Sequence, residues 1–436
     1  MDGLDSQSDL ASQLRACHEK IRCLSMCMEV AQLISSSLNL DEVLDRIMTT
    51  SRTVMGADAS SLMLVDEKTG ELVFQVAQGR VGEQLLAGFR LPRGQGIAGH
   101  VCETGEPVLV QDAYTDPRFH RDFDERTGYR TKSILCVPLK IQGKIIGVSQ
   151  VINKLDGTPF NSEDLDTFTH LCKHAAIAIE NARMHRALLR KQQIESDLAF
   201  ARSVQKSFLP KELPMVKGYS FCAHYQSAME VGGDFYDFIP LRGKRWGVLI
   251  GDVSGKGVSS ALYMARLTSD FRLRATQRGS PSKVVADIND ELCKSHQRGT
   301  FVTLLYLVLD PVKGSVRFVN AGHLPPVLVN AVGGRMRSFW GKGDPPAGIL
   351  MGRKYGVHRC RLRPGDCLLM LTDGLLEARN RKGESFGWEG VEKVVQSVTP
   401  HPAAVVEALL KALEDFTGGV PQADDVTSVA LGMEEQ

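Results

Sequence analysis

Four acidic positions, each at an end of an apolar run, are the residues of this chain best suited to chemistry. They are Asp234, Asp252, Asp373 and the pair Asp424–Asp425. Asp252, for example, follows the apolar run Trp246–Ile250, so we expect it where a buried strand ends. Carboxylates that a fold brings together repel one another unless a cation lies between them. Because hard oxygen ligands suit Mg²⁺ or Mn²⁺ better than zinc, the first hypothesis is a metal-dependent hydrolase.

The size and composition are typical of a globular protein with two domains. The chain has 436 residues, of which 43% are hydrophobic and 24% are charged. Its 52 basic and 51 acidic residues give a formal net charge of +1. This balance gives no support for general binding to nucleic acid or to an anionic membrane.

The sequence predicts a cytoplasmic protein. No stretch approaches the ~18–20 apolar residues that span a bilayer, and the N-terminal residues MDGLD lack a signal-peptide pattern. Ten cysteines are scattered without a CxxC pair, which favours reduced, buried thiols over zinc ligands or disulfides. Cys17, Cys23 and Cys27 share a predicted helix, where a redox role is the alternative.

The pattern of the first 210 residues predicts a sheet between helices. Residues 1–22 are polar and helix-compatible, and Asn39 precedes an amphipathic helix that reaches Val54. Five strands are then expected, at 61–65, 72–77, 107–111, 133–138 and 144–152. A long helix begins near Ser162, the predicted N-cap, and meets no glycine or proline before Pro210.

Along this long helix, two series of residues recur every seven positions. One contains Ile177, Met184, Lys191, Leu198 and Gln205, and the other contains Ala187, Ile194, Ala201 and Phe208. Such spacing favours a two-stranded coiled coil, although the first series has two polar members. The alternative is a helix that packs on the chain's own domains.

Beyond Tyr219 the sequence predicts antiparallel sheets flanked by helices. Three consecutive strands separated by turns fit a meander, at 300–309, 315–320 and 326–330. Helices are expected at about 257–276, 281–296, 387–397 and 401–417. Because strands and helices do not alternate strictly, the predicted class is α+β rather than a parallel α/β fold.

Five segments of the N-terminal half carry a resemblance to a known domain. They are Gly94–Val101, Thr104–Val110, Asp112–Phe119, Ser133–Leu139 and Gly147–Lys154. Together they make residues 25–184 resemble a GAF domain, which implies an antiparallel sheet with flanking helices and a small-molecule ligand. The flanking segments are then an N-terminal helical segment, 1–24, and a coiled-coil-like helical linker, 185–210.

The ligand of this GAF-like region is open between two readings. Asn153, Lys154, Phe160 and Asp164 are similar to most of the motif of GAF domains that bind cyclic nucleotides. Leu165 replaces the glutamate that closes that motif. A cyclic nucleotide is therefore one candidate. The alternative is that Asn153, Lys154 and Asp164 form a helix-anchoring salt bridge with no ligand contact.

The C-terminal half carries a second resemblance over residues 200–434. Its segments are Ala201–Pro210, Val231–Phe238, Gly251–Gly257, Asn320–Pro326, Asp344–Ile349, Pro364–Asp366, Thr372–Gly374 and Asp424–Thr427. They resemble the SpoIIE/RsbU-type branch of the PPM metal-dependent serine/threonine phosphatases. The resemblance implies an α-β-β-α sandwich for a domain at 211–434.

The same resemblance implies a centre of two Mn²⁺ or Mg²⁺ ions. Its ligands and catalytic residues match Asp234, Asp252, Asp373 and Asp424, together with the main-chain carbonyl of Val253. Asp252 would bridge both ions, and Asp425 is the alternative to Asp424. In this family the paired ions activate water for in-line attack on a phosphate group.

Two positions depart from the eukaryotic PPM pattern, and two further acids near the motifs need a role. Ser254 stands where those enzymes carry a histidine proposed to protonate the leaving group, and a serine hydroxyl is too weak an acid for that. His323 stands where some relatives carry an aspartate for a third metal, so it is open between a structural hydrogen bond and a contact with substrate phosphate. Asp237 is open between supporting the metal site and forming a turn, and Asp366 is predicted to be structural.

The resemblance also implies a substrate and a mode of control. The substrate would be a phosphorylated STAS-domain anti-anti-sigma protein in sigma-factor regulation. The chain would form a homodimer through the GAF domain and the linker helix, with neither a nucleic acid nor a membrane as partner. Changes in residues 25–184 would act on metal binding through Arg202–Leu209. The alternative is a catalytically silent regulator that binds its partner under control of a GAF ligand.

Overall fold

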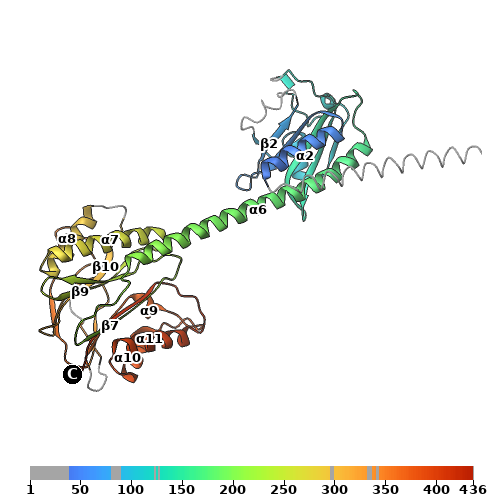
Figure 1. Ribbon diagram of the computed structural model, residues 1–436. Helices are drawn as coiled ribbons and strands as arrows, with labels where there is room; N and C mark the ends of the chain where they lie inside the picture. Colours follow the sequence, from blue (N-terminus) through green and yellow to red (C-terminus); the bar gives the residue numbers. More distant parts are fainter. Residues whose placement is uncertain are drawn as a thin grey trace, which may run out of the picture. The chain divides into compact units, whose positions relative to one another are not determined.

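The computed structural model describes residues 39–79, 90–121, 124–125, 128–294, 299–330, 336–339 and 343–435. The predicted N-terminal segment 1–24 and the cysteines at 17, 23 and 27 lie outside these residues. The chain divides into two compact units, Met1–Gln193 and Ile194–Gln436 (Figure 1). The finer boundaries at 24, 184 and 210 stay predictions.

Six strands form one antiparallel sheet in the first unit, in the order β3-β2-β1-β6-β5-β4. Their bounds are β1 Ala57–Val65, β2 Leu72–Gln78, β3 Arg90–Leu91, β4 Val108–Val110, β5 Ile134–Ile141 and β6 Lys144–Lys154. The five predicted strands are therefore confirmed. Gln142 and Gly143 join β5 to β6 with φ angles of 48° and 84°, the left-handed values that a two-residue hairpin turn requires.

Helices cover both faces of this sheet. On one face, α2 (Leu40–Val54) and the first turns of α6 (Ser162–Phe208) bury Ile47 and Phe168 against the strands. On the other face, α4 (Gly96–Thr104) packs over residues that alternate along the same strands. The layered GAF-like architecture expected for this part of the chain is thus present.

The long helix α6 runs without a break, as the absence of glycine and proline predicts. Its predicted N-cap was wrong by one residue. Ser162 already belongs to the helix, and the side-chain oxygen of Asn161 accepts the N–H groups of Glu163 and Asp164 at 2.9 and 3.0 Å. Ile177 and Met184 of the first seven-residue series are more than half exposed. The coiled coil itself stays a prediction.

Two five-stranded antiparallel sheets form the centre of the second unit. Their strand orders are β14-β11-β10-β9-β8 and β13-β12-β15-β16-β7. The bounds are β7 Tyr219–Gln226, β8 Phe235–Leu241, β9 Arg245–Val253, β10 Val302–Asp310, β11 Ser315–Ala321, β12 Val327–Val329, β13 Met336–Ser338, β14 His358–Arg361, β15 Cys367–Leu371 and β16 Val426–Met433. The predicted meander is β10, β11 and β12, but β12 crosses to the second sheet.

The two sheets pack face to face, and helices cover their outer faces (Figure 1). Phe221, Ile250 and Leu368 belong to the core between the sheets. The helices are α7 Val258–Gln277 and α8 Pro281–Lys294 on the first sheet, and α10 Gly387–Ser397 and α11 Pro402–Thr417 on the second, with the short α9 at Asp373–Glu377. The predicted helices and the α-β-β-α sandwich are confirmed.

Among the helices of the described part of the chain, none combines the length and the apolar character that crossing a bilayer demands.

Candidate acidic metal site

The predicted acidic residues lie where strands of the two sheets end. In the first sheet, Asp234 directly precedes β8 and Asp252 lies near the end of β9. The pairing of Phe235 with Gly251 places these two acids beside each other. In the second sheet, Asp373 follows β15 and Asp424 precedes the neighbouring strand β16.

Hydrogen bonds between the sheets fix the position of Asp234. Its side chain is 1% exposed, and its Oδ2 atom accepts the hydroxyl of Thr372 at 2.7 Å and that of Thr427 at 2.6 Å. Thr372 directly follows β15, and Thr427 is the second residue of β16. One sheet therefore holds the carboxylate of the other.

The carboxylate of Asp425 is hydrogen-bonded to the loop before β8. It is 7% exposed, and its carboxylate accepts the backbone N–H groups of Ala228 at 2.9 Å, Gly233 at 2.7 Å and Asp234 at 3.3 Å. The neighbouring Asp424 is more open, and its Oδ2 lies 2.9 Å from the ammonium nitrogen of Lys256. Asp425 is thus engaged by backbone groups of the loop and Asp424 is not, and the choice of Asp424 as the ligand stays a prediction.

Two glycines let these loops approach each other. A Cβ atom on Gly233 would lie 2.8 Å from the carbonyl oxygen of Val253. A Cβ atom on Gly374 would lie 2.0 Å from the carbonyl oxygen of Asp425. Any side chain at these positions would push the acidic segments apart, so the glycines are required by packing within the site.

The acidic residues act on one another electrostatically. Burial and the negative charges of Asp373 and Asp424 raise the pKa of Asp252 to about 7. Burial and the charge of Asp252 raise the pKa of Asp234 well above its usual value. Burial and Asp424 likewise raise the pKa of Asp373. Because the charge of each of these residues acts on at least one other, the four predicted side chains form one acidic cluster.

This cluster fits a divalent cation by its chemistry, although its side chains are not arranged as a finished ligand set. Within the described residues, no three His, Cys, Asp or Glu side chains are gathered closely enough to hold one ion as they stand. A cluster of carboxylates with raised pKa values is nevertheless what Mg²⁺ or Mn²⁺ would stabilise.

The raised pKa values predict a particular pH dependence when divalent metal is chelated. A carboxyl whose pKa rises on folding stabilises the fold below its unfolded pKa, and this contribution is lost as the pH rises through the folded value. For Asp252 the window runs from 3.8 to about 7. Thermal melts in EDTA should therefore show Asp252→Asn gaining stability relative to the wild type across this window. A difference that shrinks with rising pH would contradict the expectation.

The other predicted residues near the cluster have structural partners. His323 is buried, which lowers its pKa to about 4, and its Nδ1 lies 3.0 Å from the hydroxyl of Thr303. The hydroxyl of Ser254 accepts the N–H of Phe301 at 2.9 Å. His323 is therefore neutral at physiological pH, and the structural reading of this residue is supported.

Two further acids connect parts of the fold. The role of Asp237 was open from the sequence, and Asp366 was predicted to be structural. Asp237 is 1% exposed and pairs with the guanidinium of Arg272 on α7, with Nη2 to Oδ1 at 3.0 Å. Asp366 accepts the N–H of Arg363 at 2.9 Å in the turn before β15. Asp237 thus ties a helix to a strand, and the prediction for Asp366 is confirmed.

In the first unit, the predicted ion pair of Lys154 with Asp164 is present, and whether these residues contact a ligand stays a prediction. The ammonium of Lys154 lies 2.9 Å from Oδ2 of Asp164, at the start of α6. Asn153 uses its side-chain oxygen to accept the N–H groups of Lys132 and Ser133. A separate cavity of about 190 Å³ lies between α4 and the sheet, and Phe74 and Gln150 are among its lining residues.

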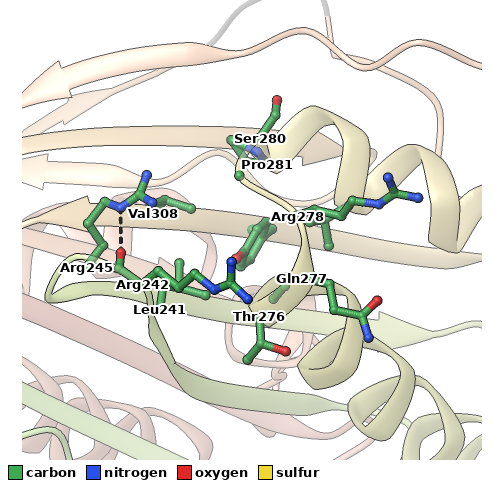
Figure 2. Close-up of a pocket in the computed structure, with 13 residues that line it drawn as sticks. Leu241, Arg242, Arg245, Thr276, Gln277, Arg278, Ser280, Pro281 and Val308 are labelled. Carbon is green, nitrogen blue, oxygen red and sulfur yellow. Dashed lines mark hydrogen bonds between the residues drawn. The ribbon is translucent and has the colours of Figure 1, made fainter.

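A further cavity in the second unit lies outside the acidic cluster. It has a volume of about 140 Å³ and is lined by residues of the β8–β9 turn and of the loop between α7 and α8. Figure 2 shows that its arginines do not converge, because Arg278 points away and pairs with Asp287 at 3.0 Å. The Nε atom of Arg245 donates to the carbonyl of Arg242. No carboxylate lines this cavity.

Sequence reasoning missed four contributors to the site. Lys256 lies within the GDVSGKG run, Thr372 within TDG and Thr427 within DDVT, so all three were part of recognised motifs without a role. Gln205 had been placed in a seven-residue series of the long helix. Its side chain instead contacts the loop that carries Asp234.

Two family models match the chain. One, described as Stage II sporulation protein E (SpoIIE), matches residues 242–434, and the other, described as GAF domain, matches residues 39–179. Together they match the two resemblances drawn from the motifs.

Similar proteins cover parts of the chain. "Probable 3',5'-cyclic phosphodiesterase pde-5" of Caenorhabditis elegans is 33% identical over 201 residues, which are 44% of this chain and 26% of that protein. Protein IcfG of Synechocystis is 27% identical over 267 residues, which are 54% of this chain and 41% of that protein. The chain thus spans less than half the length of these curated relatives.

A solved structure shares the fold of the second unit. The SiaA-PP2C domain of Pseudomonas aeruginosa is 19% identical, with a TM-score of 0.50, and covers 56% of this chain and 99% of that chain. At this identity the likeness concerns the fold alone.

Proposed function

Since this chain carries a GAF domain followed by a phosphatase domain of the SpoIIE type, we propose that it is a metal-dependent protein phosphatase for phosphoserine or phosphothreonine. The observation that supports this most is the set of carboxyl groups whose pKa values are raised by burial and by one another. Such a cluster is costly unless cations neutralise it.

In this proposal, Asp234, Asp252, Asp373, Asp424 and the carbonyl of Val253 hold the metal. When bound, two Mn²⁺ or Mg²⁺ ions supply the Lewis acidity for attack of water on the phosphate group. Asp234 keeps its place because two threonine hydroxyls hold it. Asp252, Asp373 and Asp424 have to adjust their side chains, since they do not form a ligand set as they stand.

Other residues near the cluster take supporting roles. Lys256 is about half exposed beside Asp424, so its ammonium is available to a phosphate dianion at the rim of the site. Ser254 is engaged with the backbone of Phe301, and His323 is buried and neutral. Neither serves as the acid for the leaving group in this proposal, so that proton comes from solvent.

The proposal predicts strict dependence on added divalent metal. The full chain, treated with EDTA and desalted, should hydrolyse an aryl phosphate only after Mn²⁺ or Mg²⁺ is restored. A phosphoserine-containing STAS-domain protein should be the better substrate of the two. Activity that survives chelation would contradict the metal-dependent mechanism.

A catalytically silent regulator is the second candidate. The reason to keep it is that, within the described residues, the acidic side chains do not form a ligand set as they stand, and the four acidic residues in the cluster argue against it. Binding of a phosphorylated STAS-domain protein without release of phosphate, in the presence of Mn²⁺, would favour this alternative.

We further propose that the first unit senses a small molecule and that the chain acts as a cytoplasmic homodimer. The cavity of about 190 Å³ beneath α4 supports a compact ligand, with a cyclic nucleotide as one candidate. The exposed apolar residues Ile177, Met184 and Ile194 on α6 support pairing with a second copy. Light scattering of the full chain tests the dimer.

A further inference from the structure

Gln205 connects the end of α6 directly to the backbone of the loop before β8. Its side chain is 5% exposed. The amide nitrogen Nε2 donates to the carbonyl oxygen of Gly232 at 2.6 Å, and the N–H of Gly232 donates to Oε1 at 3.2 Å. One side chain thus satisfies both backbone groups of one residue, in the way a neighbouring strand would.

The contacted glycine leaves this loop little freedom. A Cβ atom on Gly232 would lie 2.1 Å from Oδ2 of Asp425, so the loop is pressed against that carboxylate. The next residue, Gly233, donates its N–H to the same oxygen at 2.7 Å. Asp234 follows immediately. A displacement at Gly232 therefore reaches the carboxylate of Asp234 within two residues.

The same end of α6 is also attached to α7. The guanidinium of Arg272 donates from Nη2 to the carbonyl oxygen of Phe208 at 3.0 Å and pairs with Asp237. Leu209 is buried in the core that α7 forms with the first sheet. The end of α6 therefore cannot shift or rotate without straining either this attachment or the contact of Gln205 with Gly232.

We propose that Gln205 is a positioning residue that couples α6 to the Asp234 loop and thereby sets the affinity of the acidic cluster for divalent metal. The inference rests on the proposed function, because it assigns regulation to the same cluster. Only a side chain with both a donor and an acceptor can hold both groups of Gly232. Glutamate has no donor for the carbonyl oxygen, and leucine has neither group.

The test uses the full chain with Gln205→Leu and Gln205→Glu. Gln192→Leu is the matched control, because Gln192 is exposed on the same helix. Mn²⁺ affinity is measured by isothermal titration calorimetry, without substrate. We expect Mn²⁺ affinity to fall about tenfold in Gln205→Leu and less in Gln205→Glu, since one to two hydrogen bonds are lost. The control should bind as the wild type does.

Hydrogen exchange of the metal-free protein provides a second readout. Peptides covering residues 228–234 should exchange faster in Gln205→Leu, while peptides from β10 and β11 stay as in the wild type. Equal Mn²⁺ affinity and equal exchange in wild type and Gln205→Leu would overturn the coupling. If the wild type binds Mn²⁺ but releases no phosphate, the phosphatase proposal falls, and the affinity comparison still decides the role of Gln205.

Discussion

Replacing Asp252 with asparagine should reduce phosphate release by at least about 10³-fold while the protein stays folded. The reason is that Asp252 would contact both metal ions, and such contacts supply several kcal/mol to the transition state. Asp373→Asn should give a loss of the same order. The measurement is hydrolysis of an aryl phosphate at saturating Mn²⁺, together with a thermal melt of each variant.

The thermal melt separates this loss from unfolding. Asp252 and Asp373 both lie in the acidic cluster and have raised pKa values. Removing one negative charge should therefore leave the metal-free protein as stable as the wild type or more stable. Asp415→Asn, at an exposed position of α11, is the matched control and should change neither quantity. Full activity in Asp252→Asn would remove that residue from the site.

Asp425→Ala and Asp424→Ala should affect different properties: the first should lower the stability of the fold, and the second should weaken metal binding. Asp425→Ala leaves three backbone N–H groups without their acceptor in a buried loop. We expect this change to cost about 3 kcal/mol, which lowers Tm by about 6–12 °C for a unit of this size. Asp424→Ala should leave the Tm of the metal-free protein nearly unchanged and weaken Mn²⁺ binding at least about tenfold.

Isothermal titration calorimetry and thermal melts of these two variants decide which of the adjacent residues Asp424 and Asp425 binds the metal. The carboxylate of Asp424 pairs with the partly exposed Lys256 and accepts the N–H of Asp425. A stable Asp425→Ala protein that fails to bind Mn²⁺ would reverse the two roles.

Elements with a clear apolar pattern were predictable from the sequence. The runs 246–250, 300–309 and 426–431 each became a central strand, because buried strands need continuous apolar stretches. The start of α6 was less certain, since both Ser162 and Asn161 are good cap residues. Asn161 is the cap because Asp164, three residues further on, accepts the N–H of Asn161 in return at 2.9 Å.

The different roles of the residues in and around the acidic cluster were not predictable from an apolar pattern. Asp424 and Asp425 are neighbours of equal chemistry, and their roles differ because Asp425 meets a loop about 190 residues earlier in the chain. Gln205 likewise fitted a seven-residue repeat, and its partner Gly232 has no side chain, so it bonds through backbone groups that carry no sequence signal. Contacts of this kind depend on how sheets close on each other, which a local pattern does not contain.

The loop carrying Asp234 is held by groups that follow it in the chain by about 190 residues. Thr427 belongs to β16, and Asp425 directly precedes it, while β16 itself pairs with β7 and β15 in the second sheet. A chain without residues 424–433 therefore keeps Asp234 and Asp252 but loses two of the side chains that hold this loop, and of the two threonines only Thr372 still bonds to the carboxylate of Asp234. Truncation before β16 should thus loosen the acidic residues of the first sheet as well as the second sheet itself.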